Sequence, residues 1–325
     1  MAHAIIVDSH GDAEKLKYAQ VTDSKPNSGE VRLKHTAIGV NFIDVYHRTG
    51  LYGTNVPFIP GVEACGIVEE VGPNVGGLQV GDRVAYGTAI NAQGAYSTHR
   101  NIDANLLIKV PADISDEVAA AIMVKGMTAH YLIRRTYVVG PGANILVHAA
   151  AGGVGTYLCQ WASYSGCNVI GTVSTAEKAK WASENGCAYP LNVKSEDWPE
   201  QVKAITGGLG VGVVYDSIGK DTFLRSFDCL MPLGLMVSYG QSSGPVPPFD
   251  LSVLAKGNFF LTRPTLGFYK GDRNELILSG MELFEAVRLG AIAPKITQKI
   301  PLKDAAEAHR LLESRQTMGS IILVP

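Results

Sequence analysis

The residue pattern that most clearly points to chemistry is 144-NILVHAAAGGVGTYLCQWA-162, in which an apolar run ends in closely spaced glycines. A helix-like pattern follows directly. A glycine-rich turn between a strand and a helix aims backbone N–H groups and the positive helix end at one point, which suits a pyrophosphate. We therefore predict that Gly152, Gly153 and Val154 bind a dinucleotide, and that Gly155 lets the helix pack closely on the strand.

The next expected strand, 168-NVIGTVSTAEK-178, indicates which dinucleotide is bound. Sites that prefer NAD usually place Asp or Glu at the end of this strand, to hold the ribose 2′-hydroxyl. Here Ser174 stands at the tip and Lys178 follows one helical turn later. A hydroxyl with a cation suits a 2′-phosphate, so we predict NADPH as the cofactor. Alternatively, Ser174 caps the following helix and Lys178 is solvated surface.

Two later segments are expected at the same edge of the sheet. Ser217 ends one predicted strand, and 238-SYGQSSG-244 ends the next. Open α/β sheets bind ligands beyond the carboxyl ends of their strands. We therefore expect Ser217, Tyr239, Gly240, Ser242 and Ser243 along the cofactor.

The elements that must position these residues alternate in type. After a β-rich segment to about residue 120, we predict strands at 145–149, 168–173, 188–192, 212–217, 235–240 and 259–262, with helices at 154–165, 176–185, 196–206 and 221–230. Such alternation predicts a parallel sheet covered by helices on both faces. Two further helices, at 274–289 and 303–314, and a strand at 320–325 are expected to rejoin the β-rich part.

Composition excludes several classes of protein. The 325 residues are 46% hydrophobic and 18% charged, with a formal charge of −2, which predicts a folded core and no attraction to nucleic acid or anionic lipid. Five widely spaced cysteines form no C-x-x-C pair, so we expect buried, reduced thiols. No apolar window is long enough to cross a membrane, and the expected location is cytoplasmic.

Several motifs together carry a family resemblance. With the turn Ala149-x-x-Gly152-x-x-Gly155, the segments 39-GVNFIDVYHRTGLY-52, 60-PGVEACGIVEEVG-72, 123-MVKGMTAHYL-132, 216-DSIG-219 and 238-SYGQSSG-244 make the whole chain resemble the zeta-crystallin-like quinone oxidoreductases. These form a zinc-free branch of the medium-chain dehydrogenase/reductase superfamily. The resemblance implies an α/β protein in which a GroES-like, mainly β catalytic domain (1–123 and 265–325) contains an inserted Rossmann domain (124–264) with a doubly wound parallel sheet. It also implies a cleft between the domains and a homodimer.

The resemblance implies that Asn41, Asp44, Tyr46, Tyr52 and Arg263 line the substrate side, with Asn41 and Thr128 also near the nicotinamide. Asn41 and Tyr46 can donate hydrogen bonds to an acceptor oxygen, and either tyrosine can stack on a flat ring. Asp44 orients neighbouring donors or pairs with Arg263. The alternative is an ordinary polar loop at 41–52, with Thr128 and Lys125 on a helix surface.

Three further ionisable residues are not included in the catalytic set. His47 is expected to be solvated, and His148 to be a hydrogen-bonded core residue. Glu63 is open to structural pairing or to catalysis.

Zinc-dependent relatives carry a Cys and a His where this chain has Asn41 and Val62, so we predict no metal. Loss of a Lewis acid fits reduction of an electron-poor quinone by NADPH. The alternative is a zinc-free enoyl or 2-alkenal reductase, in which Tyr46 or Tyr52 would protonate carbon. A non-enzymatic alternative is an RNA-binding or crystallin-like role, as in some relatives.

Overall fold

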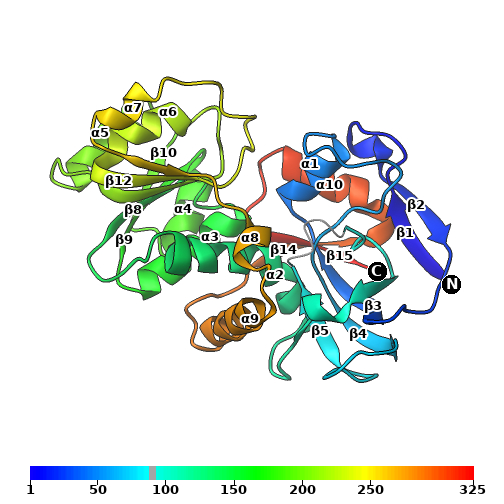
Figure 1. The fold of residues 1–325 in the computed structure, drawn as a ribbon. Helices are drawn as coiled ribbons and strands as arrows, with labels where there is room; N and C mark the ends of the chain where they lie inside the picture. The colour runs from blue at the N-terminus through cyan, green and yellow to red at the C-terminus, as the bar shows by residue number, and fades with distance from the viewer. Residues whose placement is uncertain (88–92) are drawn as a thin grey trace. The chain divides into compact units, whose positions relative to one another are not determined.

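The computed structural model describes residues 1–87 and 93–325, which form two compact units (Figure 1). Unit 1 comprises Met1–Met127, Lys270–Glu285 and Pro294–Pro325, and unit 2 comprises Thr128–Tyr269 and Ala286–Ala293. Unit 1 is therefore assembled from three separate stretches of chain. The predicted domain boundaries, 1–123 with 265–325 and 124–264, remain a proposal about which segments fold together.

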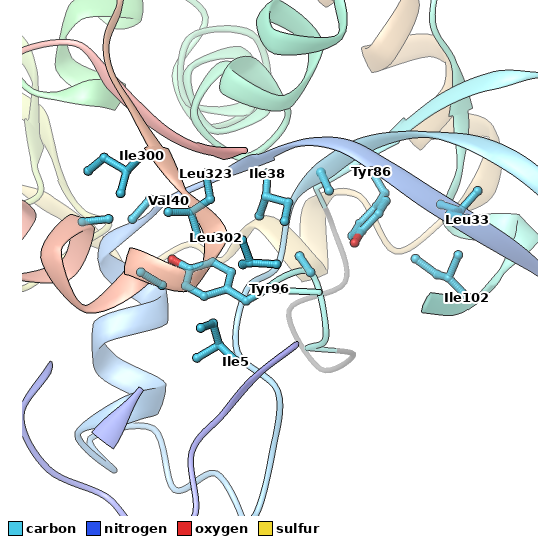
Figure 2. Packing of buried hydrophobic residues seen from close by; sticks show 14 of the residues in the cluster. Ile5, Leu33, Ile38, Val40, Tyr86, Tyr96, Ile102, Ile300, Leu302 and Leu323 are labelled. Carbon is cyan, nitrogen blue, oxygen red and sulfur yellow. The ribbon is translucent and has the colours of Figure 1, made fainter. Parts of the chain in front are cut away.

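Unit 1 is built on a seven-stranded sheet in the order β14-β15-β3-β4-β5-β7, with β6 also pairing with β3, and on the separate pair β1-β2. The strands are β1 (Ala2–Ile6), β2 (Lys17–Val21), β3 (Glu30–Gly39), β4 (Ala64–Val71), β5 (Arg83–Tyr86), β6 (His99–Asp103), β7 (Ile108–Lys109), β14 (Ile296–Pro301) and β15 (Ser320–Val324). All pairs are antiparallel except β14 with β15. Figure 2 shows the core of this unit, where Ile5, Ile38 and Leu323 come from distant parts of the sequence.

The helices that lie wholly or mostly in unit 1 are α1 (Phe42–Arg48), α2 (Asp116–Tyr131), α9 (Arg273–Arg288) and α10 (Ala305–Glu313). No helix was predicted at α1, and the alternative of an ordinary polar loop at 41–52 was wrong for residues 42–48. Asp44 accepts a hydrogen bond from the backbone N–H of Asn41 at 2.9 Å, and this bond is part of a capping box at the N-terminus of the helix. A segment of seven residues is too short to show the periodicity from which such a helix could be predicted.

Unit 2 contains a six-stranded sheet in the order β10-β9-β8-β11-β12-β13, parallel throughout. Its strands are β8 (Asn144–Val147), β9 (Asn168–Val173), β10 (Tyr189–Asn192), β11 (Val211–Asp216), β12 (Leu230–Ser238) and β13 (Phe260–Thr262). From β8 the chain first adds strands on one side and then, from β11, on the other. The predicted α/β fold with a doubly wound sheet is confirmed.

The helices of unit 2 are α3 (Gly153–Tyr164), α4 (Ala176–Glu184), α5 (Trp198–Ile205), α6 (Phe223–Ser226), α7 (Ser252–Ala255) and α8 (Leu266–Tyr269). The helix predicted at 221–230 is shorter, because α6 passes into a 3₁₀ turn at Phe227–Cys229 and β12 already begins at Leu230. Leu233 has a left-handed φ of 64°, so the early part of β12 is irregular and does not follow a simple alternation. Among the residues that the structure describes, no helix has the length and apolar character needed to cross a membrane.

Candidate cofactor and acceptor sites

The glycine turn lies between β8 and α3 in unit 2 and leaves its backbone accessible. Ala149 adopts a left-handed φ of 52°, and the N–H of Gly152 donates to the carbonyl oxygen of Ala149 at 2.8 Å. A Cβ at Gly155 would collide with that same carbonyl oxygen, so only glycine fits there. Gly152, Gly153 and Val154 remain half-buried at the start of α3. This turn has the form that a pyrophosphate requires.

The end of β9 carries a hydroxyl and a lysine but no acid. Ser174 and Lys178 are both half-buried at the start of α4. The helix is capped by Thr175, whose Oγ1 accepts a hydrogen bond from the N–H of Lys178 at 3.3 Å. The alternative in which Ser174 acts as the cap was therefore wrong, because the neighbouring threonine takes that position. The Ser174 hydroxyl is not used in capping, and a 2′-phosphate fits this end of the strand better than a 2′-hydroxyl.

The ends of β11 and β12 bring the third group of predicted residues together. The N–H of Ser242 donates to the carbonyl oxygen of Ser217 at 3.1 Å, and a Cβ at Gly240 would lie 2.8 Å from that oxygen. The N–H of Tyr239 donates to the carbonyl oxygen of Asp216 at 2.8 Å. The Ser243 hydroxyl donates to the carbonyl oxygen of Ile218 at 2.7 Å. These residues thus share one edge of the sheet with the glycine turn.

Two side chains that sequence reasoning missed hold this edge in place. Asp216 is fully buried, and its carboxylate accepts hydrogen bonds from the N–H groups of Ile218 and Gly219. Gln241 accepts a hydrogen bond from Arg263 at 3.1 Å, and Arg263 also donates to the Ser238 hydroxyl at 3.1 Å. The DSIG motif was a signal for Asp216, but nothing in the spacing indicated Gln241. Pairing of Arg263 with Asp44 stays a prediction.

Asn41 belongs to a buried cluster in unit 1 centred on Glu63. The Asn41 amide nitrogen donates to Glu63 Oε1 at 2.7 Å, and the Lys125 ammonium donates to the same oxygen at 2.9 Å. The N–H of Val124 donates to Glu63 Oε2 at 2.5 Å. Glu63 therefore makes the structural pairing that was one of its two expected roles. Because an amide nitrogen has two N–H groups, one N–H of Asn41 is not used by Glu63.

Asp44 is fully buried, and its carboxylate holds two neighbouring donors. Its Oδ2 accepts hydrogen bonds from the N–H of Asn41 at 2.9 Å and from the Tyr96 hydroxyl at 3.0 Å. Burial raises the pKa of the Asp44 carboxyl to about 7. The nearby Glu63 carboxylate pushes in the same direction, while both hydrogen bonds and Lys125 oppose it. Asp44 thus couples the start of α1 to the core.

The aromatic residues of 41–52 form a small surface. Tyr46 is half-buried, Tyr52 is 42% exposed, and their ring centroids lie 5.1 Å apart. These rings can pack on a flat ligand. His47 was expected to be solvated, and this was wrong: α1 turns its side chain inward, where Nδ1 contacts the Thr54 hydroxyl at 2.6 Å.

The remaining predicted residues are buried. Thr128 and Lys125 are 8% and 5% exposed, so the reading of both as helix surface was wrong. His148 is fully buried between the hydroxyls of Thr172 and Ser226, each 2.8 Å away, as predicted. All five cysteines are free and buried, as expected.

Zinc does not fit the position that it takes in zinc-dependent relatives. Asn41 uses its amide to bind Glu63, and Val62 is apolar and fully buried. Within residues 1–87 and 93–325 no group of three or more His, Cys, Asp or Glu is arranged to hold a metal ion.

A mainly β unit assembled from separate stretches of chain, with a parallel sheet and glycine turn in the other unit, defines a medium-chain dehydrogenase/reductase. Residues 27–140 match the family model described as the alcohol dehydrogenase GroES-like domain, and residues 153–277 match that of the zinc-binding dehydrogenases. Quinone oxidoreductase 1 of Escherichia coli (strain K12) is 47% identical, with both chains covered completely. The chain belongs to the quinone oxidoreductase family of this superfamily.

Two further similarities bear on cofactor and substrate. The crystal structure of Escherichia coli quinone oxidoreductase complexed with NADPH has a TM-score of 0.97 and 46% identity, and both chains are covered completely. The 2-haloacrylate reductase of a Burkholderia species is 45% identical, covering 100% of this chain and 99% of its own.

Proposed function

We propose that this protein is an NADPH-dependent quinone reductase. The observation that carries the proposal is the full-length likeness to a quinone oxidoreductase whose structure was solved with NADPH, at a TM-score of 0.97. The residues of the cofactor site agree with it. The glycine turn at 152–155 has no side chains that would obstruct a pyrophosphate. The end of β9 carries Ser174 and Lys178 in place of an acid.

Each group of residues has a distinct part in holding NADPH, which supplies the hydride when bound. The backbone of Gly152, Gly153 and Val154 holds the pyrophosphate at the start of α3. Ser174 and Lys178 hold the 2′-phosphate. The loops after β11 and β12, with Ser217, Tyr239, Gly240, Ser242 and Ser243, line the cofactor, and the hydroxyl of Thr128 contacts the nicotinamide end.

Residues at the start of α1 bind and orient the acceptor. Asn41 has one amide N–H that is not used by Glu63, and Tyr46 has a hydroxyl; both can donate to a quinone oxygen as negative charge develops on it. The rings of Tyr46 and Tyr52 pack against the flat acceptor. Reduction of a quinone gives a relatively stable phenolate, so positioning and hydrogen bonds suffice in place of a Lewis acid.

A second candidate, reduction of a conjugated carbon–carbon double bond, is favoured by the 2-haloacrylate reductase of Burkholderia. Such a reaction must add a proton to carbon, which requires a well-placed acid such as the hydroxyl of Tyr46 or Tyr52.

A direct assay separates the two candidates. NADPH oxidation is followed at equal concentrations of a benzoquinone, a 2-alkenal and 2-chloroacrylate. We expect kcat/KM for the quinone to exceed that for either conjugated substrate by at least about tenfold, a difference of about 1.4 kcal/mol in transition-state binding. A preference for the alkenal or the haloacrylate would assign the protein to the second class.

We further propose that the protein is a cytoplasmic homodimer. β13 lies at the edge of its sheet and presents Phe260 with 59% of its surface exposed, so this strand offers unpaired backbone groups and apolar side chains to a second copy.

A further inference from the structure

Four fully or almost fully buried polar side chains in unit 1 form a continuous chain of hydrogen bonds. Arg48 Nη1 lies 3.1 Å from His309 Nδ1, His309 Nε2 lies 3.0 Å from the Tyr96 hydroxyl, and that hydroxyl lies 3.0 Å from Asp44 Oδ2. None of the four side chains is more than 1% exposed. They come from α1, from the segment before β6, and from α10. Figure 2 shows Tyr96 in the apolar core, near Ile5 and Leu302.

The direction of each hydrogen bond follows from Arg48. A guanidinium only donates, so Nδ1 of His309 must accept and its single proton must reside on Nε2. That Nε2–H then donates to the Tyr96 oxygen, which leaves the Tyr96 proton to donate to Asp44. Burial, reinforced by Arg48, lowers the pKa of His309 to about 3, so the ring stays neutral. Arg48 is itself fixed, because it donates to both carboxylate oxygens of Glu313, at 3.0 and 2.7 Å.

This arrangement cannot relay protons. His309 could pass its Nε2 proton to Tyr96 only by taking another at Nδ1, and the partner there is an arginine, which does not release one. While Asp44 is ionised, each proton of this chain therefore has one place, and each group holds the next in one orientation.

Within the described part of unit 1, the Asp44 carboxylate forms no ion pair. Lys125 pairs with Glu63 at 2.9 Å, and Arg48 pairs with Glu313 at 2.7 Å. Asp44 Oδ2 receives two hydrogen bonds, whereas its Oδ1 is buried and has no hydrogen-bond partner among residues 1–87 and 93–325. The Tyr96 hydroxyl and the N–H of Asn41 are therefore the groups that hold this carboxylate in place.

We propose that Tyr96 and His309 are positioning residues for quinone reduction: anchored by Arg48, they hold Asp44, and Asp44 holds Asn41 at the start of α1 in the orientation that the acceptor requires. The proposal rests on the function proposed above, because Asn41 has this role only in an enzyme that reduces an acceptor. None of the four side chains that act through Asn41 needs to touch the substrate.

The test uses Tyr96→Phe, which removes one hydroxyl and keeps the ring. We expect kcat with a benzoquinone to fall about tenfold, as for loss of one hydrogen bond to a charged group, while KM for NADPH changes less than about twofold. Apart from Asn41, the residues assigned to the cofactor lie in other segments, which is why the two parameters should separate.

Tyr86→Phe is the matched control. Tyr86 is equally buried in the same unit, and its hydroxyl lies 2.9 Å from Nε2 of His35, but it makes no hydrogen bond to Asp44. We expect a similar loss of thermal stability in both variants and a loss of kcat only in Tyr96→Phe. Equal kcat values in the two variants would overturn the proposal.

His309 provides a second, independent pair of variants. Glutamine at this position can accept from Arg48 through its oxygen and donate to Tyr96 through its nitrogen, whereas leucine can do neither. His309→Gln should therefore retain most of the wild-type kcat, and His309→Leu should resemble Tyr96→Phe. If the His309→Leu variant does not fold, the His309→Gln variant still tests the proposal, because a tenfold loss of kcat in that variant would contradict the proposed role.

The pH profile supplies a readout that a purely structural role would not change. The groups around Asp44 are Asn41, Tyr96, Glu63 and Lys125, with His309, Arg48 and Glu313 behind Tyr96. Protonated Asp44 accepts hydrogen bonds less strongly, so kcat should fall as the pH is lowered through about 7. Tyr96→Phe removes a bond that lowers this pKa, so the fall should occur at higher pH. Asp44→Asn should abolish it; an unchanged midpoint in Tyr96→Phe would contradict the proposal.

A measurement without turnover separates failure of this inference from failure of the proposed function. In long-range ¹H–¹⁵N spectra, the His309 signal is the imidazole signal that disappears in the His309→Gln variant. In the wild-type protein this signal should show a proton on Nε2 and no titration between pH 8 and 5. A proton on Nδ1, or a titration near pH 6.5, would refute the hydrogen-bond directions whatever the substrate is.

Discussion

Lys178 is the residue on which the choice of cofactor depends most. It is half-buried at the start of α4, next to Ser174 and one turn beyond the end of β9. Lys178→Ala should weaken NADPH binding by about 1.5–3 kcal/mol, the range for hydrogen bonds to charged groups, and leave NADH binding nearly unchanged. Titration calorimetry with both cofactors measures the difference.

Lys180→Ala is the control for this prediction, because Lys180 is on the same helix and its side chain is 81% exposed. It should affect neither cofactor. If Lys178→Ala weakened NADPH and NADH equally, the lysine would not recognise the phosphate.

Residues whose role depends on backbone shape could be predicted from the sequence, and residues whose role depends on distant partners could not. Gly152 and Gly155 could be recognised from the sequence, because a turn of this kind between a strand and a helix favours glycine wherever it occurs. Tyr96 and His309 are 213 residues apart, and no local pattern connects them. The alternative that Ser174 caps α4 was wrong because adjacent hydroxyls are equivalent in sequence, and only backbone geometry identifies Thr175 as the cap.

At the scale of elements, the junction between β8 and α3 is set by the close approach of helix and strand. Gly155→Ala places a methyl group against the carbonyl oxygen of Ala149, so α3 must shift. We expect about 1–3 kcal/mol of destabilisation, typical of overpacking, together with weaker NADPH binding. Urea denaturation and cofactor titration measure the two effects.

Gly140→Ala is the matched control, because Gly140 precedes β8 and a Cβ there would meet no atom within 4 Å. It should be close to neutral in both measurements. Full stability and full affinity in Gly155→Ala would show that the turn tolerates a side chain and does not depend on this contact.

Elements with a continuous apolar run were predicted well, and elements made by side-chain capping were not. β9 was predicted at 168–173 and spans Asn168–Val173, because it is short, apolar and followed by a clear helix start. The segment that became α1 is only seven residues long and is stabilised by a hydrogen bond between Asp44 and Asn41, whose effect is visible only in three dimensions. Leu230–Gly234 joined β12 despite an irregular backbone.

On the scale of the whole molecule, the exposed edge of the parallel sheet predicts self-association. Phe260→Glu on β13 places charge on that edge and should convert a dimer to a monomer in sedimentation velocity experiments. Leu251→Glu is the control, since Leu251 is 70% exposed in the same unit but lies outside every strand. A monomeric wild-type protein, or a dimer in both variants, would contradict the proposed assembly.

The division of unit 1 among distant segments has a consequence during synthesis. β3 pairs with β15 through Ile38 with Leu323, and the ribosome makes the whole of unit 2 between these two strands. Domains tend to form as units while the chain emerges. The parallel sheet of unit 2 is therefore expected to fold first. Until β15 has been synthesised, β3 lacks this partner strand. During that period the nascent chain would benefit most from protection by chaperones.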